Sequence, residues 1–296
     1  MCHHLPKTAG TSLRRVMEAN FGPGELVNLT GKQKGDPAEW WRAYWASLPL
    51  ERRAAIRCVT SHTAQFLVPT VTERPVRAFC LLRDPVQRVI STFFYIAWMD
   101  EHGQRSPMLA AMRERGWTLG DAYRELADDR EVAGELGDLF WPLFNSQSRE
   151  VLAPAVGFTA LSLNPEQAEL ERHHEQVTDV LSRTYVVGVA ERFSQSVRLF
   201  ADSFGWRKRF VPRENVRPYG SRRHQIDEQT RSLIRKHNAL DEVLHASHLA
   251  HLDSLPPTSR VDDLRWRGQQ RARRDLRRAR RAARHKLRSG PAADRG

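Results

Sequence analysis

The chain has 296 residues, 40% of them apolar, with eight Trp and twelve Phe, so it can build one sizeable α/β domain with a real core. It contains no run of about eighteen uncharged apolar residues and no apolar leader segment, which argues against a membrane span and a secretory signal. The three cysteines, Cys2, Cys58 and Cys80, are sparse and odd in number, so we expect buried thiols in a reducing, cytoplasmic compartment and no disulfide scaffold.

The net charge of +12 is concentrated at one end of the chain. Residues 260–296 hold thirteen Arg and one Lys against four Asp, a net charge of +10, so residues 1–259 are nearly neutral. We therefore expect a folded domain over residues 1–256 and a separate basic tail over residues 257–296. Residues 260–288 have apolar side chains at helical spacing, which suits an anionic membrane surface or nucleic acid and allows a peripheral membrane location. A solvated, partly disordered extension is the alternative.

Strand and helix patterns alternate along the domain. An amphipathic helix with Leu13 and Val16 on its core face follows the first strand, and Asp84 and Pro85 begin a second helix as its N-cap and first turn. The expected strands are residues 2–5, 57–61, 76–82 and 185–189, and the other expected helices are residues 39–50, several within 105–150, 166–183, 193–204 and 225–252. This alternation predicts an α/β fold with a mostly parallel sheet and a helical insert.

Three chemically suited side chains follow the ends of three expected strands. Lys7, His62 and Arg83 each stand just beyond a strand. Ligands of parallel sheets collect beyond the carboxyl ends of the strands, so we expect these side chains to converge on one edge.

The segment Pro6-Lys7-Thr8-Ala9-Gly10-Thr11-Ser12 combines a Lys, three hydroxyls and main-chain amides at the start of a helix. Such an arrangement favours a bound anion. It is not a Walker A loop, because Lys7 precedes Gly10. An ordinary strand-to-helix turn with a solvated Lys7 is the alternative.

A second candidate anion site begins at Arg83, with Arg88 and Ser91 on the helix that follows. A guanidinium can bind a phosphate through two parallel hydrogen bonds, and a Ser hydroxyl can add a third. Alternatively, Arg83 pairs with a carboxylate of the protein.

These two segments resemble the 5′-phosphosulfate loop and the 3′-phosphate motif of sulfotransferases that use 3′-phosphoadenosine 5′-phosphosulfate (PAPS). The version resembles the carbohydrate branch, which includes heparan and chondroitin O-sulfotransferases and bacterial relatives. The resemblance covers roughly residues 3–250 and includes Ser61-His62, Asn145-Ser146-Gln147-Ser148-Arg149 and Val187-Gly188-Val189-Ala190-Glu191-Arg192-Phe193. The family has a longer apolar first strand, so the natural chain begins upstream or this strand is short. The basic tail has no counterpart in the family motifs.

The resemblance implies a P-loop-like three-layer fold, PAPS as sulfate donor, and no metal. It implies that Lys7 assists the leaving group and that His62 is the general base towards the acceptor hydroxyl. The implied nucleotide-binding residues are Lys7, Thr8, Ala9, Gly10, Thr11 and Ser12 at the 5′ side, and Arg83 and Ser91 at the 3′-phosphate.

Other residues have two interpretations each. Arg149 and Asn145 either contact an anionic acceptor or order the helical insert, and the Trp40–Trp45 cluster forms a core or a sugar platform. His62 is alternatively a cap or core histidine. His3 and His4 are its rivals by position, and with Cys2 they lack the usual spacing of zinc ligands.

The leading hypothesis is therefore a PAPS-dependent O-sulfotransferase acting on a glycan or a glycosylated small molecule. A nucleotide kinase or NTPase of similar fold is the second hypothesis, although the Walker A order is missing. The third is a nucleic-acid- or membrane-binding protein that acts through residues 260–288. The nearly neutral body argues against that as the main activity.

Overall fold

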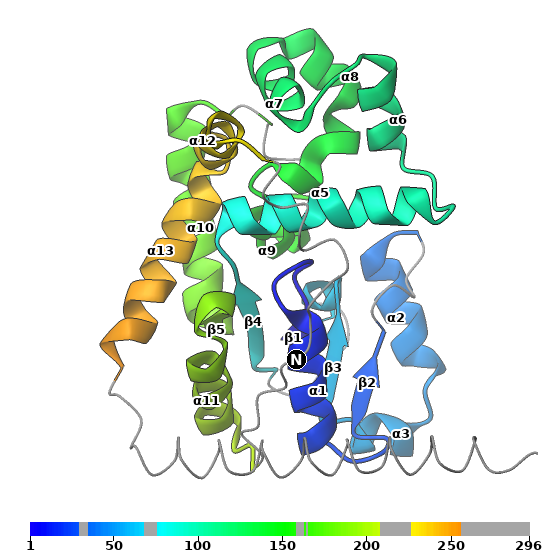
Figure 1. The fold of residues 1–296 in the computed structure, drawn as a ribbon. Helices are drawn as coiled ribbons and strands as arrows, with labels where there is room; N and C mark the ends of the chain where they lie inside the picture. Colours follow the sequence, from blue (N-terminus) through cyan, green and yellow to red (C-terminus); the bar gives the residue numbers. More distant parts are fainter. Residues whose placement is uncertain (30–34, 68–75, 158–162, 164, 208–225, 256–296) are drawn as a thin grey trace, which may run out of the picture. The chain divides into compact units, whose positions relative to one another are not determined.

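The computed structural model describes residues 1–29, 35–67, 76–157, 163, 165–207 and 226–255 (Figure 1). Residues Met1–Asp253 form one compact unit. The sequence also predicts a loop over residues 211–219, and both this segment and the basic tail at 257–296 lie outside the described residues.

A five-stranded parallel sheet is the centre of this unit. Its strands are β1 (Cys2–His3), β2 (Leu26–Asn28), β3 (Cys58–Ser61), β4 (Ala78–Leu82) and β5 (Tyr185–Val189), in the order β2-β3-β1-β4-β5. Every pairing between neighbouring strands is parallel, and β4 pairs with β5 over its whole length. The predicted α/β fold with a parallel sheet is confirmed.

Helices cover both faces of the sheet. Phe79 and Leu81 pack with α1 (Gly10–Asn20) and α11 (Phe193–Phe204) on one face. Cys80 and Leu82 point to the other face, which α9 (Ser146–Val156), α10 (Gln167–Thr184) and α13 (Ala239–Ser254) cover. Burial on both faces explains why β4 is a continuous apolar run. The three cysteines are free and buried, as expected.

The strand order reverses between β1 and β4, which are hydrogen-bonded neighbours. The chain leaves β1 towards β2 on one side of the sheet, and it leaves β4 towards β5 on the other side. Ligands of open parallel sheets bind at such a reversal. The two predicted phosphate-binding segments follow these two strands.

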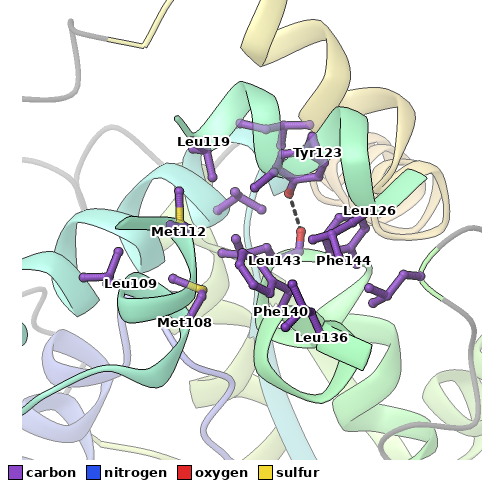
Figure 2. Close-up of a cluster of buried hydrophobic side chains, with 14 of the residues drawn as sticks. Met108, Leu109, Met112, Leu119, Tyr123, Leu126, Leu136, Phe140, Leu143 and Phe144 are labelled. Carbon is purple, nitrogen blue, oxygen red and sulfur yellow. Dashed lines mark hydrogen bonds between the residues drawn. The ribbon is translucent and has the colours of Figure 1, made fainter. Parts of the chain in front are cut away.

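Helix α5 (Pro85–Glu101) follows β4 and lies above the strands in Figure 1. Asp84 caps it, with Oδ1 accepting from the amide of Gln87 at 2.7 Å. The helical insert comprises α6 (Pro107–Glu114), α7 (Leu119–Asp128), α8 (Arg130–Phe140) and the 3₁₀ helix η2 (Trp141–Leu143). Its apolar core packs against α5, and the Tyr123 hydroxyl donates to the carbonyl of Leu143 within it (Figure 2).

Two polar side chains of α5 are deeply buried. Arg88 and Ser91 are each only 1% exposed, because the insert covers this side. Arg88 Nη2 donates to the carbonyl of Pro142 in η2 at 2.8 Å. The 3.6-residue spacing of apolar residues in α5 therefore predicts which face packs in the core, but it does not predict that polar side chains of the same helix are buried too.

Three elements differ from the sequence-based expectation. Strand β2 has only three residues and was not predicted. Instead of one helix at 39–50, α2 (Pro37–Ser47) and α3 (Leu50–Ala55) flank Pro49, and the residue before a proline avoids helical geometry. Instead of one helix at 225–252, α12 (Glu228–Lys236) and α13 are separated at Asn238, whose amide donates to the carbonyl of Leu143.

Candidate functional site

The loop between β1 and α1 has two non-glycine residues in the left-handed region, Lys7 at φ 67° and Ala9 at φ 71°. This conformation costs roughly 1–2 kcal/mol per residue, and such outliers gather at functional sites. Ala9 is the N-cap of α1, and its methyl side chain cannot accept a hydrogen bond from the helix amides. The first-turn amides of Gly10 and Thr11 are therefore suited to an anion that would replace the cap.

The hydroxyls of this loop differ in their placement. Thr8 is buried, and its Oγ1 donates to the carbonyl of Leu5 at 2.9 Å. Ser12 is buried in the first turn of α1, while Thr11 is half-buried. Thr8 thus stabilises the loop itself, and Thr11 is the most accessible of the three.

Arg83 meets this loop across the reversal of the sheet. Its Nη1 donates to the carbonyl of Lys7 at 2.8 Å, and its Nε lies 3.9 Å from Oε1 of Glu191. Glu191 stands in the 3₁₀ helix η3 (Ala190–Arg192) that follows β5. The structure therefore brings Lys7 and Arg83 together, and it adds a carboxylate at a distance too long for a tight ion pair.

Glu191 is a member of this site that the sequence analysis named only within a motif. Its Oε1 accepts from the amide of Asp84 at 3.3 Å, and its Oε2 lies 3.1 Å from Nε2 of His245. Although burial raises the pKa of Glu191, the hydrogen bond with His245 and further contacts outweigh it and lower that pKa overall. The carboxylate is therefore charged near neutral pH and partly balances Arg83.

Tyr95 on α5 holds the Lys7 side chain. The Nζ of Lys7 lies 3.8 Å from the centre of the Tyr95 ring, which is 37% exposed. A cation over an aromatic face is attracted by about 0.5–1 kcal/mol at an exposed site. The sequence pattern placed Tyr95 on the polar side of its helix but did not indicate this partner.

His62 stacks on His4 just beyond β3. The ring centres are 4.5 Å apart at an angle of 28°, and His62 Nδ1 lies 2.5 Å from the carbonyl oxygen of His4. Because a carbonyl only accepts, Nδ1 of His62 carries the proton, and in the neutral ring the lone pair is on Nε2.

His4 packs against the start of α1. A Cβ on Gly10 would overlap the His4 ring, so the ring lies directly against the main chain of the loop. Burial, together with the neighbouring His62, lowers the pKa of His4 to about 3. His4 is therefore neutral at physiological pH.

Ser91 is not joined to the other predicted residues. It is buried on α5, and among the described residues no hydrogen bond links it to Arg83 or to the Lys7 loop. Its expected contact with a phosphate stays a prediction.

Asn145 and Arg149 lie inside a buried network between α9 and α13. The Asn145 side-chain oxygen accepts from the amides of Leu240 and Asp241 at 3.0 and 3.2 Å, at the start of α13. Asp241 in turn accepts from the first-turn amides of α9, and Arg149 Nε donates to the carbonyl of Phe144 at 2.8 Å. The two helices cap each other, so this geometry supports an ordering role for both residues.

The remaining candidates are packed in the protein interior. His3 is fully buried, with Nε2 3.7 Å from Oε2 of Glu150 and Nδ1 3.3 Å from the hydroxyl of Tyr185. Trp41 is also fully buried, and its indole donates to the carbonyl of Thr63 at 2.7 Å, so this member of the Trp40–Trp45 cluster belongs to the core, while Trp40, Tyr44 and Trp45 are only partly buried.

Two features are absent from the described part of the chain. It holds no group of three or more His, Cys, Asp or Glu side chains that could bind a metal ion. No helix within it is long and apolar enough to cross a membrane.

The reversal of the sheet thus brings together two features that favour anions. One is the N-terminus of α1 beside Lys7, and the other is the guanidinium of Arg83, which contacts the same loop. Comparison of the chain with protein-family models found no match, and comparison with curated proteins found none either.

Proposed function

We propose that this chain is a sulfotransferase that moves a sulfuryl group from PAPS to a hydroxyl of a glycan or glycosylated small molecule. The proposal includes a P-loop-like version of the observed α/β fold. It is supported by the loop after the central strand β1, which leads directly into a helix whose N-cap is an alanine.

One observation carries the proposal, the hydrogen bond from Arg83 to the carbonyl of Lys7. It joins the two segments whose order in the sequence motivated the hypothesis. Because β1 and β4 are neighbours at the strand-order reversal, one nucleotide can reach both segments. An Arg83 that faced another surface would have left no double-phosphate site.

At the 5′ side, the amides of Gly10 and Thr11 and the hydroxyls of Thr11 and Ser12 would hold the phosphate. Lys7 would neutralise charge that develops on the bridging oxygen, after leaving the Tyr95 ring. When bound, PAPS supplies an activated sulfuryl group that an acceptor oxygen can take up as the bisphosphate departs. Thr8 and Ala9 would shape the loop.

At the 3′ side, Arg83 would bind the phosphate through guanidinium nitrogens other than Nη1, which donates to the carbonyl of Lys7. Ser91 is the proposed hydroxyl donor. Glu191 lies 3.9 Å from Nε of Arg83, close enough to orient the guanidinium. An arriving phosphate would therefore strengthen a preorganised cation.

His62 would take the proton of the acceptor hydroxyl. Its Nδ1 proton is held by the carbonyl of His4, so Nε2 is the basic nitrogen in the neutral ring. His4 is a poor base near neutrality because its pKa is lowered to about 3. The lowered pKa therefore argues against His4 as the base.

Calorimetric titration with adenosine 3′,5′-bisphosphate and AMP, followed by a mass-shift screen of glycan acceptors, tests the proposal. We expect the bisphosphate to bind more tightly and the acceptor to gain one sulfuryl group. Lys7→Ala should abolish transfer, whereas Arg15→Ala, which removes an exposed cation of α1 paired with Glu18, should not. Equal affinities for the two nucleotides, or Mg²⁺-dependent ATP turnover, would contradict the proposal and favour a kinase or NTPase.

A further inference from the structure

Gln147 on the first turn of α9 forms two hydrogen bonds with the main chain of Arg83. Its Oε1 accepts from the amide of Arg83 at 2.8 Å, and its Nε2 donates to the carbonyl of Arg83 at 2.9 Å. The two residues are 64 positions apart, and Gln147 is only 2% exposed. The side-chain amide thus binds the main chain as a neighbouring strand would, just beyond the last residue of β4.

Gln147 is itself held by Asp241 of α13. The main-chain amide of Gln147 donates to Asp241 Oδ2 at 3.1 Å, and Nε2 lies 3.4 Å from the same oxygen. Asp241 is 1% exposed, and its other oxygen accepts from the amide and hydroxyl of Ser148 at 2.9 and 2.6 Å. A buried carboxylate at a helix N-terminus therefore fixes the turn that carries Gln147.

Asn145 provides a second set of hydrogen bonds between the start of α9 and the start of α13. It precedes α9 with φ 44°, a left-handed conformation that Asn tolerates, and its side chain accepts from the first amides of α13. Its own amide donates to Oδ1 of Asn238 at 2.7 Å. The start of α9 is consequently tied to α13 in both directions.

These contacts determine how freely Arg83 can move. Gln147 holds its main chain, while the carbonyl of Lys7 and the nearby Glu191 restrain its guanidinium. A side chain restrained before binding loses less conformational entropy when it meets a ligand. If the main chain after β4 were free, the guanidinium would have to be ordered at the moment of binding.

We infer that Gln147 is a positioning residue for Arg83 and that it sets the preference of the site for a nucleotide with a 3′-phosphate. This inference rests on the proposed function, because it assigns the 3′-phosphate to Arg83. Gln147 does not touch the ligand. It acts only through the main chain of Arg83, whereas the 5′ side of the nucleotide lies on the loop after β1.

The test compares two nucleotides on matched variants. Gln147→Met keeps the length of the side chain and removes both hydrogen bonds to Arg83. Gln147→Asn keeps the amide but is one methylene too short to reach both groups, so it gives a second reading if the Met variant does not fold. Ser148→Ala is the control, because it removes a hydrogen bond to the same Asp241 and leaves both bonds between Gln147 and Arg83 in place.

Dissociation constants for adenosine 3′,5′-bisphosphate and AMP are measured by calorimetry on each folded variant. We expect the Gln147 variants to lose about tenfold in bisphosphate affinity and less than about twofold in AMP affinity, while Ser148→Ala keeps the wild-type ratio. A wild-type ratio in the Gln147 variants overturns the inference and leaves the proposed function standing. A wild-type protein that does not distinguish the two nucleotides overturns the proposed function and this inference with it.

Discussion

The guanidinium of Arg83 donates a hydrogen bond to the carbonyl of Lys7, a residue 76 positions earlier in the chain. The bond spans the gap between the two loops that leave β1 and β4 in opposite directions. It brings a fixed cation to a loop in which the N-cap of the helix is Ala9, whose side chain cannot accept from the helix amides. Two positive features of different origin, a side chain and a helix N-terminus, are thus set at one edge of the sheet.

Arg83→Lys tests whether the fork of the guanidinium matters. A lysine keeps the charge but has no second planar N–H group with which to bridge the Lys7 carbonyl and a phosphate. We expect affinity for adenosine 3′,5′-bisphosphate to fall by about tenfold to a hundredfold, with AMP affinity nearly unchanged. Calorimetry measures both values, and an equal loss for the two nucleotides would place Arg83 elsewhere than at the 3′-phosphate.

Gly10→Ala tests the contact between His4 and the loop. The added Cβ would overlap the His4 ring, so the ring must leave its stack on His62 or α1 must shift. We expect a loss of about 1–3 kcal/mol in the free energy of unfolding, measured by chemical denaturation. The double variant His4→Ala, Gly10→Ala should recover most of the cost that Gly10→Ala adds. Simple additivity of the two single changes would show that the ring is not the obstacle.

Asp241→Asn tests the mutual capping of α9 and α13. The change removes a buried charge that accepts from the amides of Gln147 and Ser148, and it leaves the fully buried Arg88 without its main compensating carboxylate. We expect a loss of about 3 kcal/mol in unfolding free energy.

Asp253→Asn is the matched control for that change. It removes an acid near the other end of α13, in an exposed ion pair with Arg192, and exposed pairs contribute about 0–1 kcal/mol. Similar losses for the two variants, measured by denaturation in the same buffer, would mean that the buried network adds little to stability.

Four of the five strands and the edge they share were predictable, because their signals in the sequence are local and strong. The first and last residues of β5 and α11 are those expected, and the continuous apolar sequence of β4 indicates a strand that is buried on both faces. Parallel strands share one carboxyl edge, so Lys7, His62 and Arg83 had to lie on it. Their order in the sequence was enough to place them.

The long-range partners of the site were not predictable in the same way. The separation of α12 from α13 depends on the hydrogen bond from the Asn238 side chain to the carbonyl of Leu143. The hydrogen bonds between Gln147 and Arg83 join residues 64 positions apart. Neither of these two contacts produces a periodic pattern in the sequence from which it could be predicted. The burial of Arg88 likewise depends on the insert that covers α5, which the sequence of α5 alone does not contain.

His4 should make the protein less stable in mild acid. Its pKa is lowered from 6.5 to about 3 in the folded state, chiefly by burial, so between these values the unfolded chain binds a proton that the folded chain does not. Stability therefore falls as the pH falls, by up to about 1.4 kcal/mol per pH unit between about pH 6 and pH 4. Removing the His4 imidazole should remove its contribution to this pH dependence. We expect His4→Gln to flatten the dependence of unfolding free energy on pH between pH 6 and pH 4, while above pH 8 the two proteins should differ by a constant amount. Equal slopes for His4→Gln and the unchanged protein between pH 6 and pH 4 would show that the His4 ring is protonated in the folded state, and the argument against His4 as the base would then weaken.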